Sequence, residues 1–299
     1  METLRGRTVV ITGAGSGFGL EFARLGAREG MKLVLADVQE DALDAARHEL
    51  ESAGAAVFAR VVDVADAGQV EALADDAESR FGPAHLVFNN AGVGTGGLLW
   101  ENSLADWEWT LGVNLWGVIH GVRTWVPRML DASRADPAFE AHVVNTASMA
   151  GLLNPPLSGV YNVTKHAVVS LTETLHHDLA LVTDRVHCSV LCPYYVPTGI
   201  GRSGRNRPTA AHGDATRSQR VAEAMVEKAV GSGRVSAEDV ARTTFESVAA
   251  RRFYIVSHPQ ALGGVARRAE DIVALRDPAD PFAARPGQRE SLIEALRAP

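Results

Sequence analysis

The stretch Thr8 to Gly19, TVVITGAGSGFG, decides the fold. Its first five residues, TVVIT, are all β-branched, which favours a buried strand. Four glycines alternate with other residues after the strand, and a helical pattern starts at Leu20. A glycine-rich turn between a strand and a helix lets the backbone approach a pyrophosphate, whose charge the helix N-terminus favours. A plain tight turn is the alternative interpretation.

Strand-like and helix-like segments alternate along the rest of the chain. Helices are predicted over residues 39–52 and 66–80, among others. Strands are predicted at residues 8–12, 32–37, 56–63, 85–89, 142–147, 186–191 and 253–256. This alternation predicts an α/β fold of the Rossmann type, a doubly wound parallel sheet of about seven strands with helices on both faces. We expect one domain over residues 1–265, a substrate lid at about 199–232 and a C-terminal extension over 266–299.

Composition narrows the possible partners and surroundings. A net charge of −7 argues against a nucleic-acid partner, and no apolar run approaches the roughly 20 residues that cross a bilayer. A strand-like run begins almost at once, which leaves no room for a signal peptide. The two cysteines, Cys188 and Cys192, are expected to be buried thiols rather than a disulfide or zinc site. We expect a cytoplasmic protein with no metal site.

A second motif lies between Ser148 and Lys165, SMAGLLNPPLSGVYNVTK. Tyr161 and Lys165 are one helical turn apart, so their side chains share a face. An ammonium beside a phenol favours the phenolate and lowers the tyrosine pKa, as a general acid/base needs. Ser148 could offer a hydroxyl to the same reacting oxygen. The alternative readings are a buried tyrosine, a solvated lysine and a capping serine.

Asp37, at the end of the second predicted strand, indicates which dinucleotide the turn would take. A carboxylate there can accept hydrogen bonds from the adenosine ribose. It would repel a 2′-phosphate by about 4 kcal/mol at 4 Å and an effective dielectric constant near 20. Val38 and Ser16 supply no cation to offset this repulsion, so NAD is favoured over NADP. A capping role for Asp37 on the following helix is compatible with this function.

Taken together, these motifs resemble those of short-chain dehydrogenases/reductases of the compact single-domain type, over residues 5–200. The turn from Thr12 to Gly19 has the spacing TGxxxGxG rather than GxGxxG. The matching positions are Thr12–Gly19, Asp63-Val64, Asn89-Asn90-Ala91-Gly92, Asn114, Ser148, Tyr161 and Lys165.

The resemblance implies roles for these residues. Tyr161 would exchange a proton with an alcohol or carbonyl oxygen while hydride moves to or from the nicotinamide. Lys165 would bind the nicotinamide ribose and lower the Tyr161 pKa, Ser148 would hydrogen-bond the substrate oxygen, and Asn114 would hold a water in a proton relay. The implied cofactor-binding set is Thr12, Gly13, Gly15, Ser16, Gly17, Phe18, Gly19, Asp37, Val38, Asp63, Val64, Asn90, Ala91, Gly92, Tyr161, Lys165, Pro193, Val196 and Thr198.

Two features depart from the family pattern. Tyr194 stands where the family usually has glycine after the proline at position 193, and the glycine-rich carboxyl end is missing. The segment ADWEWTLGVNLWGVIHGVRTWVPRML, the FYIVSHP strand and the tail instead resemble bacterial NAD-dependent Cα-dehydrogenases of aryl-ether alcohols. The tail could cover a second subunit or the pocket.

The residues expected around the substrate are mostly apolar and favour an apolar or aromatic alcohol over a sugar or a charged acid. They are Val93, Gly94, Leu98, Leu99, Met149, Leu152, Leu153, Pro155, Leu157, Tyr194 and Tyr195. The loop over residues 199–218 is expected to lack regular structure. Its arginines, Arg202, Arg205 and Arg207, are interpreted as solvated charges, with a grip on an acidic substrate as the alternative.

The predicted function is an NAD-dependent oxidoreductase that interconverts a secondary alcohol and a ketone. A dinucleotide-binding redox sensor without turnover is the alternative, although such proteins typically lose the tyrosine or lysine. A sugar-nucleotide epimerase would need a longer substrate domain and different glycine spacing. The family resemblance implies a homodimer or homotetramer.

Overall fold

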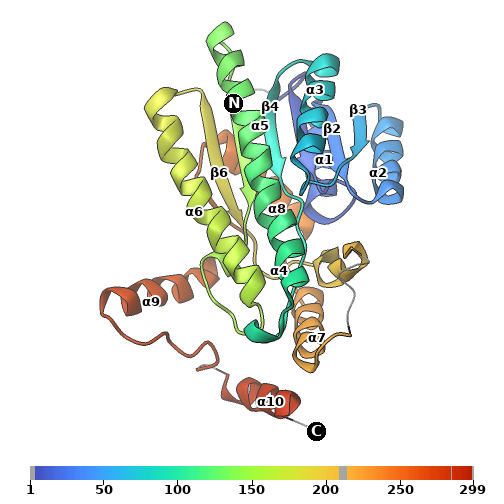
Figure 1. Cartoon of the computed structure of the whole chain (residues 1–299). Coiled ribbons are helices and arrows are strands. Elements are labelled where there is room, and N and C mark those ends of the chain that lie inside the picture. Colours follow the sequence, from blue (N-terminus) through green and yellow to red (C-terminus); the bar gives the residue numbers. More distant parts are fainter. Residues whose placement is uncertain (1–3, 209–213, 284, 298–299) are drawn as a thin grey trace.

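A parallel sheet of seven strands, in the order β3-β2-β1-β4-β5-β6-β7, forms the centre of the computed structural model, which describes residues 4–208, 214–283 and 285–297 (Figure 1). The strands are β1 (Thr8–Thr12), β2 (Lys32–Asp37), β3 (Ala56–Val61), β4 (Ala84–Asn89), β5 (Ala141–Thr146), β6 (Val186–Cys192) and β7 (Tyr254–Val256). The predicted α/β fold and sheet are confirmed. The strand order reverses between β1 and β4, where sheets of this kind bind ligands.

Helices cover both faces of the sheet, each over its own apolar core. One core packs α1 (Gly17–Arg28), α2 (Glu40–Ser52) and α8 (Ala237–Ala249) against the strands. The other packs α3 (Ala67–Phe81), α5 (Gly117–Ala135) and α6 (Gly159–Val182). Strands β1, β2, β4 and β5 are buried on both faces, which explains why their sequences read as largely continuous apolar runs rather than alternating ones.

Several element boundaries differ from those expected, for local reasons. Helix α1 begins at Gly17 rather than Leu20, so the last glycines of the turn already belong to the first helical turn. Strand β3 ends at Val61 rather than Asp63 because the Asp63 carboxylate accepts a hydrogen bond from the Ala65 N–H at 2.9 Å and turns the chain.

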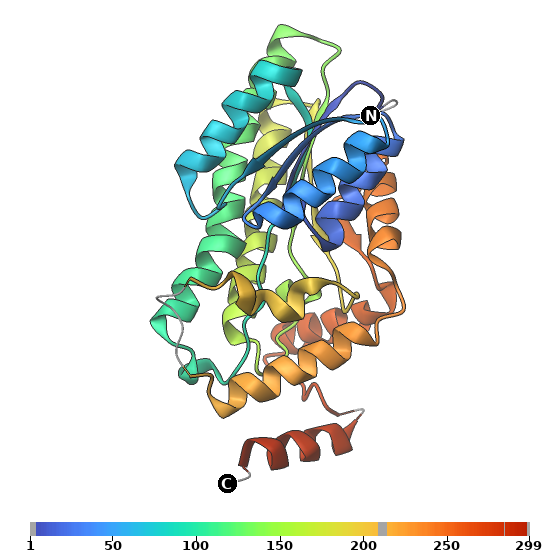
Figure 2. The same ribbon diagram turned by 90° about the vertical axis from the view of Figure 1, so that its right-hand side faces the viewer.

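The remaining elements gather beyond the carboxyl ends of the strands (Figure 2). They include η1 (Leu99–Glu101), η3 (Met149–Gly151), η4 (Gly199–Asn206), α7 (Arg217–Gly231), η6 (Pro259–Ala261), α9 (Leu262–Val273) and α10 (Pro286–Arg297). The lid is therefore more regular than expected, with the 3-10 run η4 where a structureless loop was predicted. Residues 209–213 of this stretch lie outside the described residues. Within the described chain, no helix is both long and apolar enough to span a bilayer.

Candidate active site

A large cavity of about 1620 Å³ lies at the carboxyl ends of the strands. Its walls come from the glycine turn after β1, the segments after β4, β5 and β6, the start of α6, the lid and the C-terminal extension. The two predicted motifs, the glycine turn and the Ser148–Lys165 segment, therefore meet in one space. The sequence predicted both motifs, and the fold brings them together.

The glycine turn brings the backbone close to this cavity. Gly13 and Gly17 have φ angles of +67° and +52°, in the region that favours glycine. A Cβ at Gly19 would lie 2.0 Å from the Gly13 carbonyl oxygen, so no side chain fits there. Thr12 lies behind the turn, where its hydroxyl accepts hydrogen bonds from the N–H groups of Asn90 and Ala91, at 2.9 and 3.1 Å. The backbone itself is thus held open for a ligand phosphate.

Asp37 braces the turn and also faces the cavity. Its Oδ2 accepts the Gly15 N–H at 2.9 Å and its Oδ1 accepts the Gln39 N–H at 3.0 Å. The N-cap position of α2 is Gln39, so Asp37 supports the start of that helix from two residues before. A carboxylate oxygen has further lone pairs, and Asp37 can still accept ribose hydroxyls.

Sixteen of the residues predicted to bind the cofactor line the cavity. The other three, Thr12, Gly15 and Gly19, do not line it and instead shape the turn, as described above. Those on the walls are Gly13, Ser16, Gly17, Phe18, Asp37, Val38, Asp63, Val64, Asn90, Ala91, Gly92, Tyr161, Lys165, Pro193, Val196 and Thr198.

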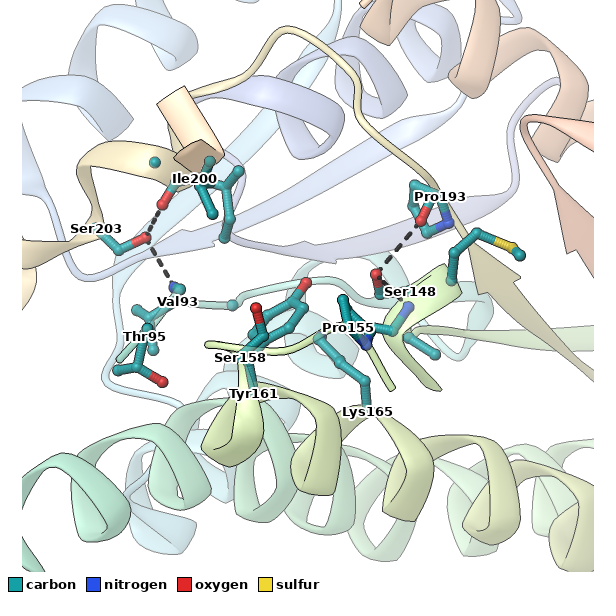
Figure 3. A pocket seen from close by; sticks show the side chains of 18 of the residues that line it. Val93, Thr95, Ser148, Pro155, Ser158, Tyr161, Lys165, Pro193, Ile200 and Ser203 are labelled. Atoms are coloured by element: carbon teal, nitrogen blue, oxygen red, sulfur yellow. Dashed lines mark hydrogen bonds between the residues drawn. The ribbon is translucent and has the colours of Figure 1, made fainter. Parts of the chain in front are cut away.

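Ser148, Tyr161 and Lys165 come together from two elements (Figure 3). Tyr161 and Lys165 lie on α6, and Ser148 follows β5. The Ser148 hydroxyl donates to the Pro193 carbonyl at 3.4 Å and accepts the Ala150 N–H at 3.1 Å. The Lys165 ammonium donates to the Thr146 carbonyl at 2.8 Å and lies 5.6 Å from the centre of the Tyr161 ring.

The expected lowering of the Tyr161 pKa is wrong. Burial raises the pKa of Tyr161 to about 12, and a hydrogen bond with Ser148 opposes this rise. Burial also lowers the pKa of Lys165 to about 8. Desolvation sets the direction of both shifts, because a buried phenolate or ammonium lacks the water that would stabilise its charge. Tyr161 is a neutral phenol here, ready to donate a proton.

Asn114 lies behind the cavity wall rather than on it. Helix α4 (Leu104–Leu111) continues through a π-helical turn, η2 (Gly112–Trp116), into α5. Within this turn the fully buried Asn114 accepts the Val93 N–H through Oδ1 at 2.8 Å and donates to the Val93 carbonyl through Nδ2 at 2.9 Å. Its amide thus holds the segment after β4 in place.

The lid is fastened to both sides of the cavity. The buried Ser203 hydroxyl accepts the Gly94 N–H at 3.0 Å. Arg205 donates to the Gln39 side chain at 3.2 Å, and Arg207 pairs with the buried Asp106. The interpretation of these arginines as solvated charges is therefore wrong for Arg207, which pairs with Asp106, whereas Arg202 and Arg205 are exposed.

The substrate side agrees only partly with the prediction. Val93, Gly94, Met149, Leu153, Pro155, Tyr194 and Tyr195 line the cavity. Leu98, Leu99, Leu152 and Leu157 do not, because Leu152 packs into the core, Leu157 is buried and Leu99 is half exposed.

Sequence reasoning missed several residues that line the cavity. Glu108, Trp109 and Glu223 come from α4 and α7, and a series of extension residues runs as far as Arg285. The tail thus covers the pocket, one of the two possibilities left open. Tyr194, which stands where the family usually has glycine, packs its ring against Tyr195 and His258, with ring centres 4.5 and 5.8 Å apart. The only sequence feature that pointed to the walls formed by the extension was the resemblance of the tail to that of Cα-dehydrogenases.

Comparisons with known proteins agree with this geometry. The family model for short chain dehydrogenase matches residues 7–208. A 1-deoxy-11-beta-hydroxypentalenate dehydrogenase of Streptomyces exfoliatus is 37% identical over 260 residues, 86% of this chain and 85% of that protein. The C alpha-dehydrogenase of a Sphingobium species is 29% identical, over 100% of this chain and 94% of that protein.

Solved structures show the same architecture. A short chain dehydrogenase/reductase from Burkholderia phymatum, solved in complex with NAD, is 54% identical and has a TM-score of 0.91. The match covers 95% of this chain and 100% of that one. With the family model spanning most of the chain, this protein belongs to the short chain dehydrogenase family of oxidoreductases.

Proposed function

We propose that the protein is an NAD-dependent oxidoreductase that interconverts a secondary alcohol and a ketone, with Tyr161 as the general acid/base. One observation carries the proposal: the hydroxyls of Tyr161 and Ser148 line the same cavity as the glycine turn braced by Asp37. A proton-transfer group and a cradle for a dinucleotide are the two parts that such a reaction needs.

The mechanism follows from the positions of these side chains. A bound nicotinamide supplies or accepts the hydride. Tyr161 gives its proton to the carbonyl oxygen in reduction and takes it from the hydroxyl in oxidation, while Ser148 donates a hydrogen bond to the same oxygen. Lys165, fixed by the Thr146 carbonyl, places a cation beside Tyr161 as the phenolate forms. Asn114 keeps the wall after β4 in register through Val93.

Asp37 supports NAD rather than NADP as the cofactor. Its carboxylate is held in place by two backbone N–H groups and faces the cavity, where it would accept ribose hydroxyls and repel a 2′-phosphate. Arg205 of the lid does reach this end of the site, but it is engaged by Gln39 and by lid carbonyls. The complex of the Burkholderia phymatum relative with NAD agrees with this assignment.

The substrate class is an apolar or aromatic secondary alcohol. Tyr194 and Tyr195, with ring centres 4.5 Å apart, form an aromatic wall, and Met149, Leu153 and Pro155 add apolar surface. The relatives named for a hydroxypentalenate and for Cα-dehydrogenation support a bulky substrate of this kind.

We further propose a cytoplasmic homodimer or homotetramer built on the paired helices α5 and α6. Trp116, just before α5, and Val163 on α6 are about half exposed, at 50% and 47%, so both offer apolar surface to a second copy of the chain. Both cysteines are free and buried, in keeping with a reducing compartment.

A direct assay tests the proposal. Purified protein with NAD and a panel of apolar and aromatic secondary alcohols should form NADH, followed by its absorbance. Tyr161→Phe should lower kcat by at least about 100-fold, the usual contribution of a general acid/base, and leave NADH affinity within about threefold. A wild-type protein that binds NADH but turns over neither these alcohols nor the matching ketones would favour the redox sensor.

A further inference from the structure

The C-terminal extension supplies one wall of the cavity, and that wall is rich in arginine. Arg267 and Arg268 reach it from α9, and Arg276 and Arg285 from the segment that follows. Figure 2 shows α9 and this segment beyond the carboxyl ends of the strands. Apolar walls from Met149, Leu153 and the two tyrosines therefore face a cationic one.

Each carboxylate of this wall has an arginine partner, although Oδ2 of Asp271 is buried without a hydrogen bond. Asp271 accepts from Arg276 at 2.8 Å, and Asp280 accepts from Arg289 at 3.2 Å. Among the described residues, Arg267, Arg268 and Arg285 have no carboxylate partner. Three guanidinium groups thus border the cavity with their charge free to act on a ligand.

Tyr195 links this wall to the reaction centre. The positive charge of Arg285 lowers the pKa of Tyr195, against a larger rise from burial, and so reaches its hydroxyl. Tyr195 in turn acts electrostatically on Tyr161. Tyr161, Tyr195 and Arg285 also line the same cavity. A substrate oxidised at Tyr161 can therefore extend past Tyr195 toward Arg285.

We propose that the substrate carries an anionic group, a carboxylate on an apolar or aromatic body, which Arg285, Arg267 and Arg268 bind while the alcohol lies at Tyr161 and Ser148. The proposal rests on the function given above and specifies its substrate class. It also revises the expectation that the pocket disfavours a charged acid: the body is apolar, and the charge belongs at the end of the molecule near the extension.

Matched neutral and charged probes test this. The pairs are 4-(1-hydroxyethyl)benzoate and its methyl ester, and the longer biphenyl analogues of both. Wild-type kcat/KM should favour the acid over the ester by about tenfold, mostly through KM, for at least one length. The preference should fall as salt is raised, because the charges are partly exposed.

Variants of the wall separate charge from shape. Arg285→Ala, and the double variant of Arg267 and Arg268 to alanine, should each remove most of the preference for the acid and leave ester kinetics within about twofold. Arg285→Lys should restore part of it. Arg297→Ala is the matched control, since Arg297 is an exposed arginine of the same extension that does not line the cavity, and it should change neither substrate.

A second readout keeps this inference distinct from the proposed function. Biphenyl-4-carboxylate and its uncharged carboxamide are titrated into the protein by calorimetry. If no alcohol is oxidised but the carboxylate binds more tightly and Arg285→Ala removes the difference, the anion site stands and the proposed reaction fails. If acid and ester are oxidised equally well at both lengths, or the arginine variants weaken both alike, the anion site is refuted. If no alcohol is oxidised and the carboxylate binds no more tightly than the carboxamide, both the proposed reaction and the anion site are refuted.

Discussion

At the scale of single residues, the site depends on charges held away from water. Lys165 is 3% exposed and donates its hydrogen bond to a backbone carbonyl, with burial lowering its pKa to about 8 from an ordinary 10.5. Such a shift corresponds to about 3 kcal/mol of lost stability while the amine stays charged. A group this costly is retained for its function rather than for the fold.

Comparison with Lys165→Met should reveal this loss of stability in the pH dependence of the free energy of unfolding. Since the folded-state pKa of Lys165 is depressed, the unfolded chain binds more protons between pH 8 and 10.5, and wild-type stability gains there as pH rises. From pH 7 to pH 10, the free energy of unfolding of wild type should rise by about 1–3 kcal/mol relative to that of Lys165→Met. Urea denaturation at several pH values measures it.

Lys228→Met is the matched control, an exposed lysine on α7 that lines no part of the cavity. Its difference from wild type should stay constant over the same pH range. A constant difference for Lys165→Met as well would mean that its ammonium is not desolvated.

Asp37→Ser should change the choice of cofactor. Loss of the carboxylate removes a repulsion of about 4 kcal/mol at contact distance together with an acceptor for ribose hydroxyls. We expect the ratio of kcat/KM for NADP to that for NAD to rise by at least about 100-fold, measured by initial rates. Glu40→Gln, an exposed carboxylate close by in α2, should leave the ratio unchanged. A wild type that already prefers NADP would contradict the charge argument.

At the scale of elements, the π turn of α4–α5 is the unusual feature. Its Gly117 N–H bonds to the Gly112 carbonyl, five residues back, and Gly117 lies so close to Val64 that a Cβ there would be 2.7 Å from a Val64 methyl group. π turns inside α-helices often occur at functional sites. Here the turn places the Asn114 amide against the backbone of Val93.

Asn114→Ala should weaken both fold and activity. It leaves the buried N–H and carbonyl of Val93 without partners, which costs about 1–3 kcal/mol for each group. We expect a lower melting temperature and at least about tenfold lower kcat with an aromatic alcohol. Thr164→Val is the control, because it keeps both bonds between Asn114 and Val93. It removes the 3.3 Å bond from Asn114 and the 2.8 Å bond that the Thr164 hydroxyl donates to the Tyr161 carbonyl, and it should change kcat by less than about threefold. Full activity in Asn114→Ala would show that the wall after β4 needs no such support.

The sequence predicted some elements well and others poorly, for physical reasons. The strands and the glycine turn follow from local composition, and the Tyr161–Lys165 pair from helical spacing. The π turn depends on how closely Gly117 packs on Val64, and the lid on pairings such as Arg207 with Asp106, 101 residues apart. The raised Tyr161 pKa depends on burial, which no local pattern encodes.

At the scale of the whole molecule, the extension adds a wall to a cavity that the compact domain begins. Residues 276, 278–281, 283 and 285 line it, whereas α10 lies further out and contacts α7, where the Arg217 side chain donates to the Ala295 carbonyl. Figure 1 shows α10 at the edge of the molecule. Residues 1–265 hold the sheet, both large cores and the predicted cofactor positions.

Two truncations test this division. Removal of residues 266–299 should leave a folded protein that binds NADH within about threefold of wild type, by fluorescence titration, but has at least about tenfold lower kcat/KM for an aromatic alcohol. Removal of residues 286–299 alone takes away α10 and should change kcat/KM by less than about twofold. Unaltered kinetics after the longer truncation would exclude the extension from the substrate site.

The two contacts that hold the lid, finally, bear on how bound molecules would leave the cavity. Arg205 ties it at Gln39, beside the glycine turn, and Arg207 ties it at Asp106 on α4. Because the same short segment is anchored on both sides, lifting it uncovers both halves of the cavity at once. If this segment opens during turnover, one motion would release both product and dinucleotide, and its rate would limit the number of catalytic cycles per second.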